Sequence, residues 1–367
     1  MGTKIGIVTF HSANNYGAVL QAYALQEYLA QCNIEPEIVD YRNAVFEKQY
    51  RSFSLESKNP KTILRTILNY PIVRKKEKVF AAFRRRYLKM GEAYGEDTIE
   101  KADDHYDAFV FGSDQVWNCR LTHNDPNYFG AFITDPGKLN SYAASFGDRH
   151  SDPSEYTDLL KRFRSVSVRE SEGVRQFAAL TGRSDAKAVA DPVFLLERDA
   201  WERLALESTK KSGAGNYIFL YTLKGKTTSL MQAAQYLSAK TGLPIIEFQA
   251  WVSLKPKHVK PRYADGPTDF LRWIQNAKFV LTDSFHCTAF SIIFQKNFWV
   301  RTGTAEPGGR IESLLKELQV EGRVIPSELT KWHYEQIPVY EEIAPRLKEM
   351  ADRSKTFIKE KIIGEPV

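Results

Sequence analysis

Short apolar runs alternate with amphipathic, helix-like segments along most of the chain. The first run, Lys4–Phe10, precedes a polar loop, and apolar residues then recur near helical spacing from Gly17 to Ala30. This alternation is typical of an open, mostly parallel α/β sheet. The later runs that predict strands are Glu37–Asp40, Asp107–Phe111, Leu139–Phe146, Ser165–Val168, a strand ending at Asp191-Pro192, Tyr217–Tyr221, Pro244–Phe248, Lys278–Thr282 and Phe298–Arg301.

Both halves of the chain show the same order of strands and helices, without an internal repeat. We therefore expect two similar α/β domains, residues 1–192 and 193–367, that face each other across a cleft. A basic, helical insertion at about residues 41–90 interrupts the first domain. The other predicted helices are Glu172–Leu180, Thr228–Ala239, Pro267–Asn276 with Thr268 as its cap, Thr288–Phe294, Arg310–Leu318 and a long final helix, Tyr340–Lys361.

The positive charge of the chain is concentrated in one segment. The 367 residues carry a net charge of +6, and Arg74–Lys89, with eight basic residues and one acidic residue, accounts for +7. Because Phe80, Phe83 and Tyr87 recur at helical spacing, this segment is predicted to be an amphipathic helix with a basic face. Such a helix either covers the core with a solvated face or contacts an anionic surface. We expect no nucleic-acid partner, since no recognised nucleic-acid-binding module accompanies the basic segment.

Composition also disfavours several classes of protein. No stretch reaches the ~18 consecutive apolar residues of a transmembrane helix, and the N-terminal sequence lacks the apolar core of a signal peptide. The three cysteines are far apart and the seven histidines show no ligand spacing, so we expect neither a disulfide framework nor a metal site. These features predict a cytoplasmic protein.

Ligands of open α/β sheets bind outside the carboxyl ends of the strands, and this rule selects His11–Gly17, Gly112–Asn118, Arg169 and Asp283–His286. His286 lies in a polar and aromatic turn, where an imidazole is either a structural group or a general acid–base that titrates near working pH. Arg169 ends a predicted strand. It is either a solvated tip or, if it points into the cleft, a ligand for carboxylate or phosphate.

Two of these loops allow both a structural and a functional interpretation. The polar residues of Gly112–Asn118 either cap a helix while Trp117 packs on the core, or they bind a ligand. Asn15 and Gly17 belong to the sequence NNYG, a turn whose exposed amides would suit an anion at a helix N-terminus. Neither a dinucleotide fingerprint nor a phosphate-binding P-loop is present.

Seven segments run in a fixed order through about residues 5–320: NNYGAVLQAYAL, FVFGSDQVWN, SYAASFG, VSVRESEG, ADPVFLL, FLRWIQNAKFVLTDSFHCTAFSIIF and GGRIESLL. Together they resemble the polysaccharide pyruvyl transferase family. The resemblance implies two Rossmann-like domains of the GT-B type, with the site in the cleft between them. It also implies transfer of a pyruvyl group from phosphoenolpyruvate to two hydroxyls of one sugar, forming a cyclic ketal in a bacterial capsule, exopolysaccharide or cell-wall glycan. No metal or other cofactor is expected for this chemistry.

The resemblance also implies roles for individual side chains. Arg169 and Arg310 match family arginines, and we expect them to hold the carboxylate and phosphate of the donor, helped by the amides of the NNYG turn. His286 would deliver or remove a proton. Ser284, which stands where other branches of the family carry an arginine, is also expected at the substrate site. The residues expected to bind the saccharide acceptor are Ser113, Asp114, Gln115 and Asn118, with Trp117 as a stacking face.

Two other functions remain open at this point. A GT-B-type glycosyltransferase would use a nucleotide sugar and release a nucleoside diphosphate, whereas a non-catalytic glycan-binding protein would show no turnover. If the acceptor is a polyprenyl-diphosphate-linked saccharide, the basic segment Arg74–Lys89 would hold the enzyme at the anionic inner face of the cell membrane.

Overall fold

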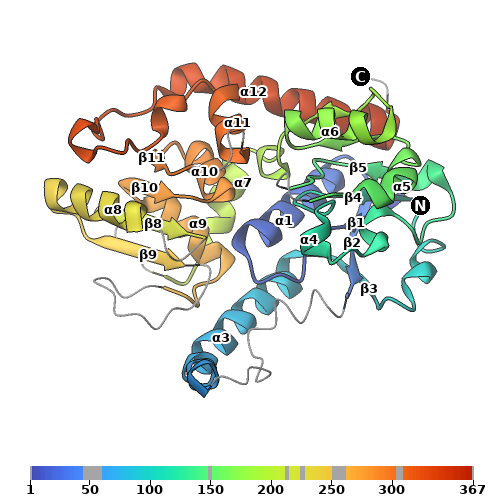
Figure 1. Cartoon of the computed structure of the whole chain (residues 1–367), viewed down its shortest axis with the longest axis horizontal. Coiled ribbons are helices and arrows are strands. Elements are labelled where there is room, and N and C mark those ends of the chain that lie inside the picture. Colours follow the sequence, from blue (N-terminus) through green and yellow to red (C-terminus); the bar gives the residue numbers. More distant parts are fainter. Residues whose placement is uncertain are drawn as a thin grey trace.

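Two parallel β-sheets, one from each half of the chain, form the frame of the molecule (Figure 1). The computed structural model describes residues 2–43, 60–147, 151–210, 215–223, 228–249, 262–302 and 309–365. Helices surround both sheets, and the prediction of a parallel α/β fold is confirmed.

The first sheet has the strand order β3-β2-β1-β4-β5, with all strands parallel. Its strands are β1 (Lys4–Val8), β2 (Glu35–Tyr41), β3 (Met90–Tyr94), β4 (Ala108–Phe111) and β5 (Leu139–Ser141). Beyond β5, isolated bridges from Asn140 and Ala144 join a short parallel pair, β6 (Ser167–Val168) and β7 (Lys187–Ala188), to the sheet. Because the strands are parallel, their carboxyl ends meet at one edge.

The second sheet has the order β11-β10-β8-β9 and is also parallel. Its strands are β8 (Ile218–Thr222), β9 (Ile245–Gln249), β10 (Phe279–Thr282) and β11 (Asn297–Val300). Every residue of β8 and β10 is buried, which explains why these strands are continuous apolar runs rather than alternating ones.

Helices cover both sheets and connect their strands. Those of the first half are α1 (Tyr16–Gln31), α3 (Pro60–Tyr87), α4 (Cys119–Thr122), α5 (Thr157–Lys161) and α6 (Ser171–Thr181). Those of the second half are α7 (Arg198–Leu206), α8 (Thr228–Thr241), α9 (Pro267–Asn276), α10 (Phe285–Ile293), α11 (Arg310–Glu317) and α12 (Tyr340–Phe357). Within the described ranges, no helix combines the length and the apolarity needed to cross a membrane.

Helix α1 packs against both halves of the chain. Tyr16 stacks on Phe270 of α9 with 4.4 Å between ring centres, and its hydroxyl donates a 2.8 Å hydrogen bond to the carbonyl of Asp265. Twelve of the sixteen residues of α1 are buried, so it has no broad polar face. A core that includes α1, α9 and α10 therefore joins the two sheets.

The C-terminal helix α12 returns to the first half (Figure 1). The amide of Ala190, which follows β7, donates a 2.8 Å hydrogen bond to Oγ of Ser354. Arg164 donates a 2.9 Å bond to the carbonyl of Ile362, in the π-helical stretch Ile358–Ile363 that continues α12. The boundary predicted between residues 192 and 193 stays a prediction, and the last helix, from the second predicted domain, contacts the first at Ala190 and Arg164.

Several predicted boundaries require correction. Tyr41 belongs to β2 and Met90 to β3, so the insertion predicted at 41–90 lies between these strands, and its residues 44–59 fall outside the described ranges. The predicted strand Leu139–Phe146 is regular only to Ser141. Gly266, not Thr268, precedes α9, because its amide is capped by the side chain of Asp269.

Candidate active site

Asp191 is the buried centre of a charged cluster. Its Oδ2 lies 2.9 Å from Nη1 of Arg169 and 3.4 Å from Nε2 of His286, and it accepts a 3.3 Å hydrogen bond from Oγ of Ser113. Its Oδ1 accepts a 3.1 Å bond from the amide of Val193. Burial alone would raise the pKa of Asp191, but His286 and Arg169 hold it well below its usual range. The carboxylate is therefore ionised at neutral pH and links three separate segments of the chain.

Arg169 follows β6 and is enclosed by carboxylates, with only 3% of its side chain exposed. Its Nε donates a 3.0 Å bond to Glu170 and its Nη2 lies 3.8 Å from Oδ1 of Asp114. Burial alone would lower the pKa of Arg169, but the carboxylates of Glu170, Asp191 and Asp114 raise it. The guanidinium also lies 5.0 Å from the ring centre of Phe285. Nη2 is buried without a hydrogen-bond partner in the described part of the chain, so it retains a donor for a ligand.

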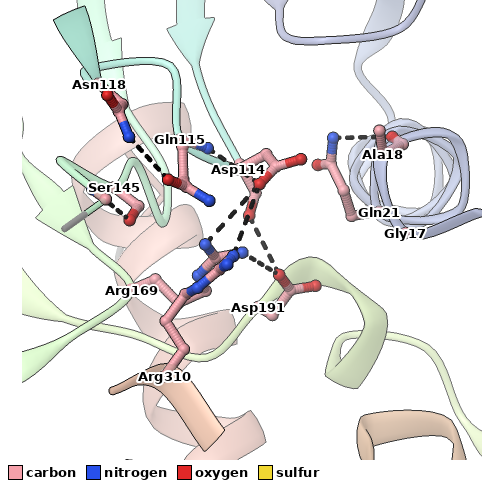
Figure 2. A network of polar contacts seen from close by, with 12 residues as sticks. Gly17, Ala18, Gln21, Asp114, Gln115, Asn118, Ser145, Arg169, Asp191 and Arg310 are labelled. Atoms are coloured by element: carbon pink, nitrogen blue, oxygen red, sulfur yellow. Dashed lines mark hydrogen bonds and ion pairs between the residues drawn. The ribbon is translucent and has the colours of Figure 1, made fainter. Parts of the chain in front are cut away.

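Arg310 opens α11 and reaches the same cluster from the second half of the chain (Figure 2). Its Nη1 lies 3.9 Å from Oδ1 of Asp114, the oxygen that Arg169 also faces, and 29% of its side chain is exposed. Burial and the neighbouring Arg169 lower the pKa of Arg310. An anion between the two guanidinium groups would relieve their repulsion. Among the described residues no side chain caps the helix at Gly309, and the first amides of α11 add partial positive charge here.

A cleft of about 790 Å³ opens between the starts of α6 and α11. This volume lies within the usual range of ligand sites, ~300–1,000 Å³. The charged residues that line it are Arg169, Arg175, Arg310, Lys316, Arg353, Glu170, Glu172, Glu312 and Glu317. Arg175 is paired with Glu172, and Arg353 with Glu317. Arg310 is part-exposed, and its ion-pair contact with Asp114 is long, at 3.9 Å. It is therefore the lining arginine best placed to receive an anion.

His286 lies in the first turn of α10, directly against α1. We predicted a helix from Thr288, but α10 begins three residues earlier because Ser284 is its N-cap. Nε2 of the imidazole faces Asp191, while its Nδ1 packs on Gly17 so closely that a Cβ at position 17 would lie 2.0 Å from it. Asp191 and Gly17 thus fix the position of the ring from both sides.

The turn after β4 carries Ser113 and Asp114 in an uncommon backbone conformation. The peptide bond between Gly112 and Ser113 is cis, and Asp114 has a φ of 77°. Gly112 has a φ of 122°, and a Cβ there would lie 2.3 Å from the carbonyl oxygen of Tyr142, so only glycine fits. Strained backbone at positive φ costs roughly 1–3 kcal/mol and concentrates at functional sites. The positive φ of Asp114 favours a functional role for this residue over that of an ordinary helix cap.

Two of the residues predicted to bind the acceptor have structural roles. Trp117 is completely buried and packs against Phe146, Phe163 and Phe177, so it offers no face for stacking on a sugar. Asn118 caps α4 through Oδ1, and its Nδ2 donates a 2.8 Å bond to Oε1 of Gln115 (Figure 2). Asn118 and Ser113 are both buried, and Ser113 donates its hydroxyl to Asp191, so Asp114 and Gln115 are the polar members of this group that keep some exposure.

The NNYG turn and Ser284 also act as helix caps. Oδ1 of Asn15 accepts hydrogen bonds from the amides of Gly17, at 2.9 Å, and Ala18, at 3.3 Å. These amides are already satisfied, so the expectation that they bind an anion needs correction. Oγ of the buried Ser284 accepts a 3.4 Å bond from the amide of Cys287. Ser284 is therefore the helix cap that places His286 in the first turn of α10.

Three residues of the site were missed from the sequence: Asp191, Glu170 and Gln21. Oε1 of Glu170 accepts bonds from both Arg169 and Ser145. Gln21, on the side of α1 that faces Asp114 in Figure 2, donates a 2.8 Å bond to Oγ1 of Thr9, which in turn donates to the carbonyl of Ser113. Asp191 could have been found, because it ends a predicted strand and the rule of carboxyl ends applies to it as well.

Among the residues that the structure describes, no group of three or more His, Cys, Asp or Glu side chains is arranged to hold a metal ion. The expectation of chemistry without a metal or other cofactor stays a prediction.

Comparison with known proteins places this site in a family context. The sequence profile of the polysaccharide pyruvyl transferase family matches residues 15–302, which include Asp114, Arg169, Asp191 and His286 but not Arg310. A search of curated protein sequences gave no match.

Solved structures establish the fold. The UDP-GlcNAc 2-epimerase of Neisseria meningitidis, bound to UDP-GlcNAc, is similar with a TM-score of 0.55, 11% identity and coverage of 98% of this chain and 99% of that one. The structure of S. aureus MnaA with UDP is similar with a TM-score of 0.53 and 11% identity, and the match covers 100% of this chain and 99% of that one. A Methanocaldococcus jannaschii UDP-GlcNAc 2-epimerase is similar with a TM-score of 0.50 and 13% identity, and the match covers 97% of this chain and 94% of that one. At this identity the likeness shows the fold alone, and it confirms the predicted GT-B arrangement.

Proposed function

The chain belongs to the polysaccharide pyruvyl transferase family, and from this premise we propose that it transfers a pyruvyl group from phosphoenolpyruvate to two hydroxyls of one sugar. The products are a cyclic ketal and inorganic phosphate. The observation that carries the proposal is the meeting of Arg169, Arg310, Asp191 and His286, from four separate segments, in one charged cluster beside the cleft.

Arg310 is proposed as the main anchor of the donor. Phosphoenolpyruvate carries a carboxylate and a phosphate, and the part-exposed guanidinium of Arg310 at the start of α11 suits such an anion. Arg169 contributes its Nη2 but is otherwise held by Glu170 and Asp191. Our expectation of two equal cationic anchors is therefore revised to one accessible arginine and one buried arginine that orients the cluster.

His286 is proposed as the group that moves the proton. Protonation of the enol methylene makes the central carbon of the donor electrophilic, a sugar hydroxyl adds there and loses its proton, phosphate leaves, and a second hydroxyl closes the ketal. A positioned acid–base contributes typically ~10²–10⁴-fold to such a step. The ionised carboxylate of Asp191, 3.4 Å from Nε2, would stabilise the protonated imidazole during the cycle.

The acceptor is proposed to be a saccharide of a bacterial surface glycan, in a capsule or exopolysaccharide, bound in the part of the cleft that the donor leaves free. Asp114 and Gln115 are its proposed hydrogen-bonding partners. If this saccharide is linked to polyprenyl diphosphate, the enzyme works at the inner face of the cell membrane.

Product analysis tests the proposal against its alternative. The protein is incubated with phosphoenolpyruvate and a panel of lipid-linked and free saccharides, and in parallel with UDP-sugars and the same acceptors. The proposal predicts release of inorganic phosphate that requires both donor and acceptor and is lost in His286→Ala. Release of UDP without any phosphoenolpyruvate-dependent phosphate would show a nucleotide-sugar glycosyltransferase instead, while absence of turnover with saccharide binding would show a glycan-binding protein.

A further inference from the structure

The N-terminal half of helix α3 exposes a cluster of large apolar side chains. Seven such side chains are exposed in the described part of the chain, and four of them lie within six residues of α3: Ile67 at 52%, Leu68 at 58%, Tyr70 at 40% and Ile72 at 36%. Figure 1 shows α3 projecting from the body, with its N-terminal end farthest from both sheets. We call these four residues the α3 tip.

The C-terminal half of α3 is fixed to the protein. Phe80 and Phe83 are buried, and Phe80 packs on Tyr16 of α1 with 5.2 Å between ring centres. The ammonium group of Lys76 lies 5.8 Å from the ring centre of Tyr16, and Arg84 donates a 3.2 Å bond to Asn14. At ~100° per residue, Ile67 lies opposite these positions, Leu68 and Tyr70 lie to either side, and Ile72 lies on their side of the helix. The tip therefore projects from a helix whose C-terminal half is anchored on the body.

Exposed basic side chains follow the α3 tip in the sequence of the helix. Arg74, Lys75 and Lys78 are exposed, and helical geometry places them between the directions of Tyr70 and Leu68. Glu77 is the sole acidic residue in the sequence of α3. An apolar end followed by a band of cations complements a surface that is anionic outside and apolar just below.

We propose that α3 docks the protein on an anionic lipid bilayer, with the α3 tip inserted at the level of the headgroups and Arg74, Lys75 and Lys78 against their phosphates. Amphipathic helices bind membranes through these two contributions, buried apolar area and attraction to anionic lipid. The docking relies on the proposed function only for its purpose, access to a lipid-linked acceptor, and does not depend on the chemistry of the cleft.

This inference also corrects the assignment made from sequence. The predicted contact covered the whole of Arg74–Lys89, but Arg84 is half-buried against Asn14 and Arg86 forms a 2.5 Å ion pair with Glu207, which directly follows α7. The membrane-facing part is accordingly the N-terminal half of α3, where the apolar residues are exposed.

Cosedimentation of the full chain with lipid vesicles tests the docking. One set of vesicles contains phosphatidylglycerol in phosphatidylcholine, and the other contains phosphatidylcholine alone. The wild type is compared with the apolar variant Ile67→Ser/Leu68→Ser/Ile72→Ser and with the charge variant Arg74→Gln/Lys75→Gln/Lys78→Gln. The matched controls are Ile337→Ser/Val339→Ser, which removes exposed apolar side chains elsewhere, and Arg86→Gln, which removes a paired cation of the same helix.

The proposal predicts that the wild type binds only the anionic vesicles, that each triple variant loses at least about tenfold in partition coefficient, and that both controls bind as the wild type does. Circular dichroism and activity on a short soluble acceptor should stay unchanged in all variants. Equal binding of wild type and triple variants, or no binding by either, would overturn it. So would sedimentation velocity showing a dimer that only the apolar variant disrupts, because the tip would then contact a second copy. Vesicle binding in a protein without phosphoenolpyruvate turnover would refute the proposed function and leave the docking intact.

Discussion

A Cβ at Gly17 would lie 2.0 Å from Nδ1 of His286. The first turn of α1 and the first turn of α10 therefore meet with no space for a side chain, and Gly17 determines where the imidazole lies. On the other side of the ring, Asp191 lies 3.4 Å from Nε2. The position of the proposed proton-transferring group is thus set by one glycine and one carboxylate from distant parts of the sequence.

Gly17→Ala should displace the imidazole and lower kcat by at least about tenfold, within the ~10²–10⁴-fold that an acid–base contributes. The variant should also be less stable to thermal unfolding, since forcing a methyl group against the buried ring costs typically ~1–3 kcal/mol. The matched control is Gly95→Ala, because a Cβ at Gly95 meets no atom within 4 Å. Unchanged kcat in Gly17→Ala would mean that the position of His286 does not matter for turnover.

Asp191→Asn should destabilise the protein by about 3 kcal/mol at neutral pH, because it removes the charge of a buried ion pair. The depressed pKa of Asp191 gives the sign of the pH dependence. Its stabilising contribution is complete above the unfolded-state pKa, about 3.9, and declines as the pH falls further toward the folded-state value. Urea unfolding at several pH values should therefore show a difference between wild type and variant that is constant near neutrality and shrinks below about pH 4.

The control for this series is Asp158→Asn, which removes an exposed carboxylate paired with Lys161. Its unfolding should follow that of the wild type. A difference between Asp191→Asn and the wild type that stays the same down to pH 3 would contradict the ionised, buried pair.

Arg310→Gln should raise the KM for phosphoenolpyruvate by at least about tenfold, since charge-assisted hydrogen bonds contribute ~1.5–3 kcal/mol. Stability should change little, because Arg310 is part-exposed and its ion pair with Asp114 is long, at 3.9 Å. Arg353→Gln is the comparison: Arg353 lines the same cleft but is paired with Glu317. Steady-state kinetics that show equal effects of the two substitutions would remove Arg310 from the donor site.

Trp117 provides a test of the correction made to the acceptor site. Because its ring is buried among Phe146, Phe163 and Phe177, Trp117→Phe should leave the KM for the acceptor unchanged, and Trp117→Ala should cost about 3–5 kcal/mol of stability. Kinetics and urea unfolding of both variants measure these effects. A rise in the acceptor KM of the correctly folded Trp117→Phe protein would restore a role in stacking.

The fold could be predicted from sequence because buried parallel strands are short, continuous apolar runs, as in β8 and β10. Element ends were less predictable, since they depend on individual caps. Ser284 starts α10 before His286, and Gly266 with Asp269 starts α9. The long run Leu139–Phe146 contains only one short strand, β5.

The site was predictable as a set of loops but not as a set of contacts. The rule of carboxyl ends located Asp114, Arg169 and His286. It could not show that Arg169 is buried among carboxylates or that Trp117 faces the core, because those environments are built by residues far away in sequence. Asp191 brings the cluster together, and its role appears only when β7, β6 and α10 are placed in space.

Transfer of isotope from labelled phosphoenolpyruvate to a saccharide tests the central claim most directly. The full chain is incubated with phosphoenolpyruvate that carries ¹⁴C in its three carbons and with the acceptor panel, and the saccharides are separated and counted. The proposal predicts label in an acid-labile ketal on the saccharide, formed in equal amount with inorganic phosphate and lost in His286→Ala. Unlabelled saccharides in the presence of active transfer from a UDP-sugar would contradict it.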